Sequence, residues 1–252
     1  MSYIDTHAHL YLCKPPLAEL VQKAKTAEVS GILNVGLNVE TSLQAWQMAQ
    51  EYPQFLFPTA GIHPCETPKN PDLSALKTVV ETHTFHAIGE IGLDFYRDNG
   101  PEEDQIRLFR AQLDLAAEKN LSAIIHNRHS DLQMIQVLKA YPQVRKVVHC
   151  FSADQTFIDQ TIGDGTTFYS FTGLITTSDR DSYFDAIRSI PLNRIMIETD
   201  CPYLTPKPFK PTENQPAFVP EVAVKLADIL GQTIDVIAKA TTQNAKHFFN
   251  LP

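Results

Sequence analysis

Short apolar runs alternate with longer amphipathic segments along the whole chain, and this alternation constrains the fold more than any other feature. The runs are rich in Val, Ile and Phe, and their length is typical of strands that are buried on both faces, as in a parallel sheet. Eight runs are predicted to be strands: residues 3–7, 31–36, 55–63, 86–94, 122–127, 146–151, 167–173 and 194–200.

The segments between these runs have the periodicity of amphipathic helices. Helices are predicted over residues 17–29, 104–120, 130–141 and 219–230, and a short closing helix over 242–249. Strands that alternate with helices over 252 residues predict an α/β fold, a single (β/α)₈ TIM barrel. An open doubly wound sheet is the alternative, but no glycine-rich phosphate-binding fingerprint follows the first predicted strand.

The organisation of the chain favours one barrel domain over residues 1–252, because no linker, repeat or low-complexity tract interrupts it.

The net charge of −8 argues against a basic module that binds duplex DNA, because contacts between basic residues and phosphates dominate affinity for nucleic acid. An acidic protein can still process nucleic acid if a bound metal supplies the positive charge.

Several features predict a cytoplasmic protein with no membrane association. No run of about 18 uncharged apolar residues is present, and no secretory signal is recognised before the first predicted strand. The four cysteines contain no C-x-x-C pair, which argues against a zinc ribbon or a thioredoxin-like site and fits a reducing compartment. No obligate protein partner is evident from the sequence.

The first predicted strand carries an unusual set of polar residues. In YIDTHAHLYL, residues 3–12, Asp5, His7 and His9 occupy alternate positions, so they are predicted to face the same side of the strand. Such polar groups are costly on an inward face unless something binds them, and neutral imidazole is the commonest metal ligand. This segment alone leaves two options open, a metal site and a hydrogen-bonded polar cluster.

Imidazoles and carboxylates gather in the predicted strands or at their carboxyl ends, where barrel active sites are built. They are His7, His9, His63, Glu90, His126, His149, Glu198 and Asp200. Three carboxylates in one cavity would repel one another unless cations neutralised them. Two metal ions fit this set better than one, with Glu90 as the bridge between them. His7, His9 and Asp200 would hold the first ion, and His126 and His149 the second.

The chain resembles the TatD-family metal-dependent deoxyribonucleases, a branch of the amidohydrolase-like barrels. The motifs that carry the resemblance run from end to end: IDTHAH (4–9), GIHP (61–64), IGEIGLDFYR (88–97), IIHNR (124–128), VVHCFS (147–152) and IETDCPYLTP (197–206). The resemblance implies metal contacts from His7, His9, Glu90, His126, His149 and Asp200. It also implies that His63 faces the substrate phosphate. Glu198 is expected to orient a ligand or a basic neighbour.

The expected reaction is hydrolysis of DNA by a metal-activated water, with Glu90, Asp200 and His63 as catalytic residues. The cofactor would be two divalent ions, Mg²⁺, Mn²⁺ or Zn²⁺. Asp200 is the candidate base. Four cations are predicted to bind substrate: Arg97 and Arg128 at a non-bridging oxygen, and Lys207 and Lys210 along the flanking backbone. The expected substrate is a single strand or a frayed 3′ end, cut in a 3′–5′ exonuclease-like manner.

Three departures from the family pattern concern the rim of the site. Tyr11 stands where the family has Asp or Asn, residues 127–129 read Asn-Arg-His instead of Ser-Arg-Asp, and the loop at 210–216 reads KPTENQP, with an added acid, Glu213. The altered loop favours an alternative, a metal-dependent ester or amide hydrolase such as a D-aminoacyl-tRNA deacylase, with tRNA as partner. A catalytically inactive binding module is disfavoured, because all six predicted ligand positions are retained.

Overall fold

A computed structural model describes residues 1–69 and 71–252 of the chain. Within these residues eight strands are found: β1 (Tyr3–Ala8), β2 (Val29–Val35), β3 (Leu56–Thr59), β4 (Ala87–Asp94), β5 (Ser122–Arg128), β6 (Lys146–Val148), β7 (Thr167–Phe171) and β8 (Ile195–Ile197). Each of them overlaps one of the predicted runs. Several are shorter than predicted, because their last residues leave the ladder and form the rim of the barrel.

The helices of the described residues are α1 (Leu17–Thr26), α2 (Val39–Glu51), α3 (Leu73–Thr82), α4 (Glu102–Lys119), α5 (Asp131–Lys139), α6 (Gln155–Thr161), α7 (Asp181–Ser189), α8 (Val219–Leu230) and α9 (Ile234–Phe249). Short 3₁₀ turns are η1 (Leu10–Leu12), η2 (Pro64–Lys69), η3 (Ile162–Asp164), η4 (Gly173–Thr176), η5 (Leu192–Arg194), η6 (Lys207–Phe209) and η7 (Pro216–Phe218). The predicted closing helix over 242–249 is the second half of α9. This helix begins earlier, where the Thr233 side chain accepts a hydrogen bond from the Val236 N–H.

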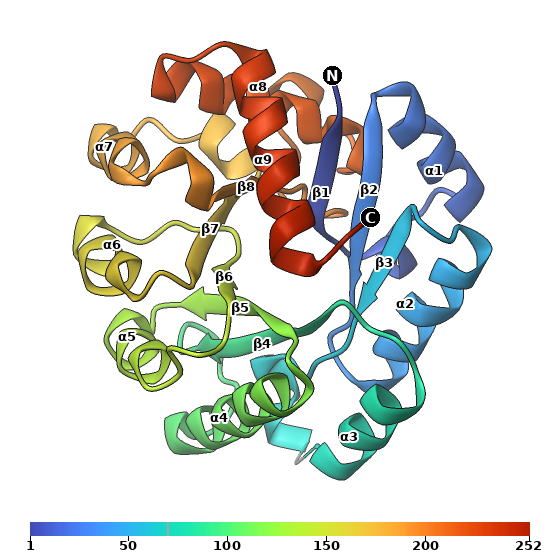
Figure 1. Ribbon diagram of the computed structural model, residues 1–252, viewed down its shortest axis with the longest axis vertical. Coiled ribbons are helices and arrows are strands. Elements are labelled where there is room, and N and C mark those ends of the chain that lie inside the picture. Colours follow the sequence, from blue (N-terminus) through green and yellow to red (C-terminus); the bar gives the residue numbers. More distant parts are fainter. Residues whose placement is uncertain (70) are drawn as a thin grey trace.

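The strands form two parallel sheets, ordered β1-β2-β3 and β4-β5-β6-β7-β8. Single parallel bridges join them at both seams, Ala60 with Ile88 and Ala8 with Cys201. At the second seam the His9 N–H donates to the Cys201 carbonyl at 2.9 Å. In Figure 1, α1 to α8 follow one another clockwise around the outside of the strands. The predicted TIM barrel is therefore confirmed.

One end of the barrel is closed by α9, which lies across the front of the view in Figure 1. Phe248 and Phe249 pack there with apolar residues from the first halves of the strands, including Ile4 and Ala87. The ring centroids of Phe168 and Phe248 are 4.9 Å apart. Because this end is filled by apolar side chains, the polar side chains of the strands gather at the opposite end.

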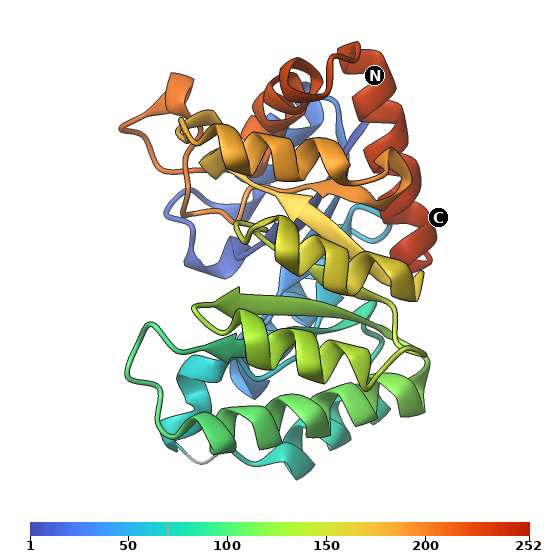
Figure 2. The ribbon, with the colours of Figure 1, turned by 90° about the vertical axis from the view of Figure 1, so that its left-hand side faces the viewer.

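The opposite end carries the long loops. Figure 2 shows that the loop between β4 and α4 and the loop after β8 project from the same side, away from the two chain termini. Gly92 allows β4 and β5 to approach there: its φ is +145°, and a Cβ at this position would lie 2.0 Å from the His126 carbonyl oxygen. Any larger residue would push apart the two strands that carry Glu90 and His126.

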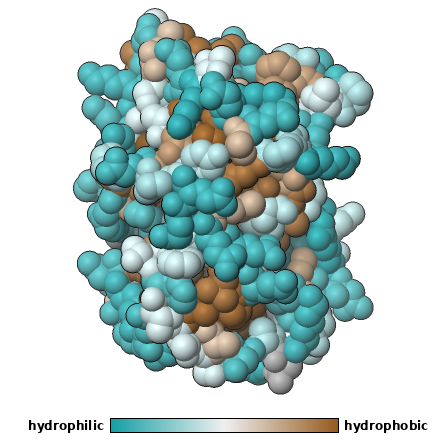
Figure 3. All heavy atoms as spheres, turned by 90° about the vertical axis from the view of Figure 1, so that its right-hand side faces the viewer, coloured by the Kyte–Doolittle hydropathy of each residue, from teal (hydrophilic) through white to brown (hydrophobic). Residues whose placement is uncertain are grey.

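The outer surface is mostly polar. Figure 3 shows the side on which α1, α2 and α3 lie, where hydrophilic side chains predominate and apolar ones are visible between them. No helix in the described part of the chain is both long and apolar enough to cross a membrane. The organisation of residues 1–252 as a single domain stays a prediction.

Candidate metal centre

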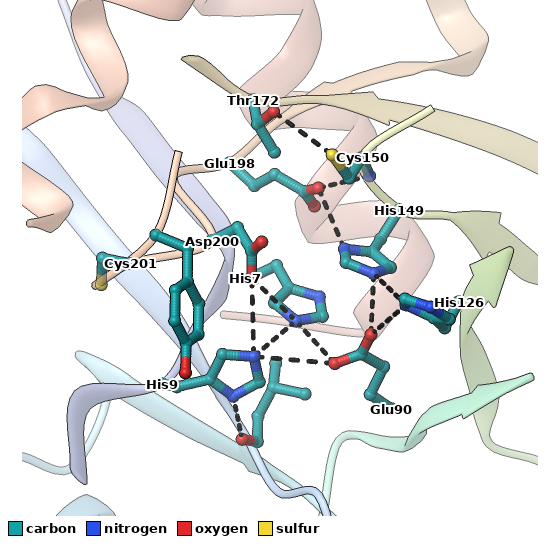
Figure 4. A network of polar contacts seen from close by, with 12 residues as sticks. His7, His9, Glu90, His126, His149, Cys150, Thr172, Glu198, Asp200 and Cys201 are labelled. Carbon is teal, nitrogen blue, oxygen red and sulfur yellow. Dashed lines mark hydrogen bonds and ion pairs between the residues drawn. The ribbon is translucent and has the colours of Figure 1, made fainter. Parts of the chain in front are cut away.

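The predicted ligands come from five strands and meet at the carboxyl end of the barrel (Figure 4). They are His7 in β1, His9 just after β1, Glu90 in β4, His126 in β5, His149 just after β6 and Asp200 after β8. Asp200 has a φ of +57°, a left-handed conformation that Asp tolerates better than most residues, and its N–H donates to the His7 carbonyl at 2.8 Å. This backbone contact holds Asp200 beside the first strand.

One oxygen of Glu90 belongs to a group with His7, His9 and Asp200. Glu90 Oε2 lies 3.3 Å from His7 Nε2 and 3.6 Å from His9 Nε2. The two Nε2 atoms are 3.2 Å apart, and Asp200 Oδ1 lies 3.7 Å from the first and 3.5 Å from the second. Ligands at about 2.1 Å from a tetrahedral ion are about 3.4 Å from one another, so this spacing fits a divalent cation.

The other oxygen of Glu90 faces a second group. Glu90 Oε1 lies 2.9 Å from His126 Nδ1 and 2.8 Å from His149 Nε2, and these two nitrogens are 3.4 Å apart. Neighbouring ligands of an octahedral ion are about 3.0 Å apart when each is about 2.1 Å from the metal. The second group therefore also has the spacing and the donor types of a cation site.

The His9 imidazole is oriented by a hydrogen bond on its far side. His9 Nδ1 lies 2.8 Å from the Val35 carbonyl oxygen, so it carries the proton and leaves Nε2 as a lone pair facing the centre. Tyr11 donates to the same carbonyl oxygen at 2.8 Å. Tyr11, at a position where the family pattern has an acid or amide, thus shares the acceptor that orients His9.

Glu198 faces the other nitrogen of the His149 ring. Its Oε1 accepts from the Cys150 N–H at 2.7 Å and lies 3.4 Å from His149 Nδ1, while Oε2 accepts from the Ser170 hydroxyl at 2.6 Å. Figure 4 shows Glu198 on the side of His149 that is away from Glu90. Glu198 therefore lies beside a predicted ligand, and its role in orienting that ligand stays a prediction.

Asp94, at the end of β4, is a residue of the centre that the sequence analysis did not single out. It is buried, and its Oδ2 lies 3.5 Å from His126 Nε2. Its Oδ1 accepts from the backbone N–H groups of Tyr96 and Arg97, each at 3.0 Å. Its place within the IGLDFYR motif, four residues after Glu90 on the same strand, was the available signal.

Replacing Asp94 with Asn is expected to weaken divalent-metal binding by about 10- to 100-fold. The Asn amide would face His126 Nε2 as a donor, which favours the tautomer with the proton on Nδ1, the atom that faces Glu90. Isothermal titration with Mn²⁺ measures the change. Asp98→Asn, an exposed acid on the same loop, is the matched control, and equal affinities in all three proteins would contradict this role of Asp94.

The charges of the centre balance one another. Burial raises the pKa of Glu90, but His149, His63 and His7 hold it well below its usual range. Burial lowers the pKa of His149, but Glu90 and Glu198 raise it well above its usual range. Burial also raises the pKa of Asp200, and the bond from His9 with the nearby imidazoles lowers it below its usual range. The two acids are therefore ionised at neutral pH, as ligands of a cation must be.

His63 adds a further imidazole at the edge of the second group. Its Nδ1 accepts from the Cys65 N–H at 3.1 Å, so the proton of the neutral ring is on Nε2, which lies 3.5 Å from Glu90 Oε1. Burial, with the neighbouring imidazoles, lowers its pKa to about 3. His63 thus points a neutral N–H donor into the centre.

Asp5 departs from the prediction made for the first strand. The register of β1 is irregular between Asp5 and Ala8, so strict alternation fails. The Asp5 carboxylate accepts from the Thr199 N–H at 2.9 Å and the Thr199 hydroxyl at 2.6 Å, instead of joining His7 and His9 around a common point. Burial raises its pKa to about 8. Asp5 therefore fastens the segment after β8 to β1.

The predicted substrate-binding cations lie at the rim. Arg97 Nη1 is 3.8 Å from Cys65 Sγ, beside the segment that carries His63. The Arg128 guanidinium stacks on the Tyr96 ring, 4.0 Å from its centroid. Lys207 and Lys210 are exposed on the loop after β8.

The added acid of this loop is engaged elsewhere. Glu213 accepts from the Lys14 N–H at 2.8 Å, and its second oxygen lies 3.5 Å from Lys14 Nζ. Asn214, which is buried, donates to the Thr199 carbonyl at 2.8 Å. These contacts fasten the loop to the segments that follow β1 and β8.

The family model described as "TatD related DNase" matches residues 4–250. The chain belongs to the TatD family. Over 98% of both chains it is 35% identical to a protein of Bacillus subtilis named "Uncharacterized metal-dependent hydrolase YabD". It is 33% identical to a protein of Erwinia tasmaniensis named "3'-5' ssDNA/RNA exonuclease TatD", over 92% of this chain and 93% of that one.

A solved structure supports the same assignment. The TatD homologue YJJV of Escherichia coli superposes with a TM-score of 0.91 at 30% identity, over 99% of this chain and 98% of that one. An amidohydrolase of Saccharomyces cerevisiae matches with a TM-score of 0.85 at 16% identity, which shows the shared fold. The chain is accordingly a TatD-type metal-dependent hydrolase.

Proposed function

We propose that this protein hydrolyses phosphodiester bonds of single-stranded nucleic acid, preferably DNA, from the 3′ end, with two divalent ions as cofactor. The division of the Glu90 carboxylate carries the proposal: one oxygen faces His7, His9 and Asp200, and the other faces His126 and His149. A carboxylate shared between two such ligand groups can bridge two ions, and two adjacent ions suit phosphodiester hydrolysis because they stabilise both the attacking and the leaving oxygen. Mg²⁺, Mn²⁺ and Zn²⁺ are the candidate ions.

The names of the relatives support the nuclease assignment. The Erwinia tasmaniensis protein and one of Pectobacterium carotovorum, each 33% identical to this chain, both bear the name "3'-5' ssDNA/RNA exonuclease TatD". They match over 92% of this chain and 93% of their own lengths, so the similarity extends over most of the chain. DNA as partner, single-strand preference and 3′ polarity are transferred to this chain on that basis.

The roles of the side chains follow from their positions. Bound divalent ions would lower the pKa of a water molecule toward neutrality and neutralise charge on the phosphoryl oxygens. Asp200, ionised beside His7 and His9, is the base that accepts the proton of the attacking water. His63 is a neutral ring with its N–H directed into the centre, and it donates to a phosphate oxygen.

The rim cations complete the substrate site. Arg97 lies beside the His63 segment and is placed to bind a non-bridging oxygen. Arg128 stacks on Tyr96 through its flat face, which keeps the N–H edge of the guanidinium for a phosphate. Lys207 and Lys210, both exposed, would follow the backbone of the strand.

A substrate panel tests the function. Purified protein with Mg²⁺, Mn²⁺ or Zn²⁺ is expected to shorten a 5′-labelled single strand stepwise and to release the label of a 3′-labelled strand in the first product. A blunt duplex of the same sequence should be degraded at least tenfold more slowly, because the acidic chain offers few cations to grip it. Cleavage of D-aminoacyl-tRNA alone would overturn the nuclease assignment.

The ester-hydrolase alternative receives little support from the rim. The altered loop at 210–216 favours this alternative, but its added acid, Glu213, pairs with Lys14 and so adds no free charge at the centre. D-aminoacyl-tRNA therefore serves only as a comparison substrate in the panel. We also propose a cytoplasmic location, which the four free thiols of the chain support.

A further inference from the structure

An exposed tyrosine lies on the loop after β4, close to the candidate metal centre. Tyr96 is 58% exposed, and its backbone N–H donates to Asp94 Oδ1 at 3.0 Å. The other oxygen of Asp94 faces His126 at 3.5 Å. A single buried carboxylate therefore links the segment that carries Tyr96 to one of the imidazoles of the centre.

The Tyr96 ring is fixed by two residues from the end of β5. The Arg128 guanidinium lies over its face at 4.0 Å, within the range of a cation–π interaction. The His129 ring meets it edge to face, with centroids 4.9 Å apart and planes at 69°. Arg128 and His129 follow His126 closely in sequence, so the ring is held against the strand that supplies a ligand.

This arrangement leaves an ordered aromatic surface open to solvent. More than half of Tyr96 remains exposed although Arg128 already lies over one face, so the ring retains area for another stacking partner. Bases of single strands stack on such rings with little regard to sequence, and a neighbouring arginine can bind the adjoining phosphate. Attraction between the phosphates of a strand and a basic surface is a weaker basis for binding here, because the exposed acid Asp98 lies on the same loop.

We propose that Tyr96 determines the preference for nucleic-acid substrates by stacking on a base next to the scissile phosphate, with Arg128 holding the ring in place. The proposal rests on the nuclease function proposed above. It assigns the base-binding side of the site to the rim formed by β4 and β5, rather than to the long loop after β8.

The loop after β8 offers the matched comparison. Tyr203 is 55% exposed, and its N–H donates to the Asp200 carbonyl at 2.9 Å. Like Tyr96, it is therefore linked by one backbone hydrogen bond to a residue of the centre. Among the described residues no cation lies over its ring, in contrast to Tyr96. Tyr203→Leu therefore removes an equally exposed rim aromatic that lacks the ordered surroundings.

The experiment crosses protein variants with substrates that lack one base. Wild type, Tyr96→Leu, Tyr96→Phe and Tyr203→Leu are assayed for kcat/KM on a natural oligonucleotide and on three versions, each abasic at one of the last three positions. On the natural strand, the kcat/KM of Tyr96→Leu should be about tenfold below that of wild type. On one abasic version the two proteins should have equal kcat/KM, because no base is left there to stack on the ring. Tyr96→Phe and Tyr203→Leu should retain wild-type rates on the natural strand.

Other outcomes overturn the proposal in distinct ways. An equal loss on natural and abasic strands would show that Tyr96 only supports the structure of the loop. Full activity of Tyr96→Leu on the natural strand would exclude stacking on this ring. A base-dependent loss of activity in Tyr203→Leu alone would show that the base stacks on Tyr203, on the loop after β8. If wild type degrades none of the strands, the proposed nuclease function is wrong, and so is the proposed stacking on Tyr96.

Discussion

Replacing Glu90 with Ala is expected to lower hydrolytic turnover by on the order of 10³-fold or more. Its two oxygens face both ligand groups, so the substitution removes a ligand from each at once. It also leaves His149 without the carboxylate that lies 2.8 Å from Nε2. Bound metal, measured by elemental analysis after dialysis, should fall together with the rate.

Two further variants make this result specific. Glu90→Gln keeps the size of the side chain but removes its charge, and we expect the same loss of metal and rate. Glu213→Gln alters an acid at the rim that is paired with Lys14, and it should keep both. Near-normal turnover of Glu90→Ala, with a circular dichroism spectrum like that of wild type, would contradict the shared-ligand role.

Replacing Lys146 with Met is expected to destabilise the fold by about 3–5 kcal/mol, a loss of roughly 10 °C in melting temperature. The Lys146 side chain is fully buried, and its ammonium lies 3.0 Å from Asp164 Oδ2. It also donates to the Tyr141 carbonyl and the Thr166 hydroxyl, each at 2.9 Å. Methionine fills the space but removes the cation that pairs with Asp164 and the donor to the Tyr141 carbonyl and the Thr166 hydroxyl.

Lys77 provides the matched control, because its ammonium also lies 3.0 Å from a carboxylate, that of Glu118, but both side chains are about half exposed. Lys77→Met should therefore cost no more than about 1 kcal/mol. Differential scanning calorimetry measures both variants. Equal melting temperatures for Lys146→Met and Lys77→Met would contradict a structural role for the buried pair.

The pH dependence of the Lys146 effect has a defined sign. Burial raises the pKa of Asp164, but hydrogen bonds from Thr166, Thr167 and Lys146 bring it below its usual range. A carboxyl whose folded pKa is lowered stabilises the protein above its unfolded pKa, and this contribution is lost as the pH falls through the folded value. The destabilisation caused by Lys146→Met should therefore be largest near neutral pH and shrink in acid.

Much of this protein can be read from residue type and spacing. Short apolar runs between amphipathic segments predict the barrel, because apolar residues are spaced differently in a strand that is buried on both faces and in a helix that is buried on one. The ends of those runs predict where His126, His149 and Asp200 meet, since all parallel strands place their carboxyl ends at one rim. The family follows from the same motifs.

Some contacts could not be predicted from local pattern. Strict alternation predicts Asp5 beside His7 and His9, but the register of β1 is irregular and Asp5 bonds to Thr199 instead. Lys146 looks like an ordinary charge at the start of a strand, and only the packing around it shows that it is buried. In both cases the side chain's environment is set by residues far away in sequence.

Strand period and strand direction are local properties of the chain, so the order of the residues is enough to predict the barrel and the imidazoles and carboxylates that reach its mouth. How these side chains are used depends on the folded chain: Glu90 divides its oxygens between two ligand groups, Asp94 faces His126, and Arg128 stacks on Tyr96. Those facts depend on register and loop conformation, which arise when segments distant in sequence pack against one another.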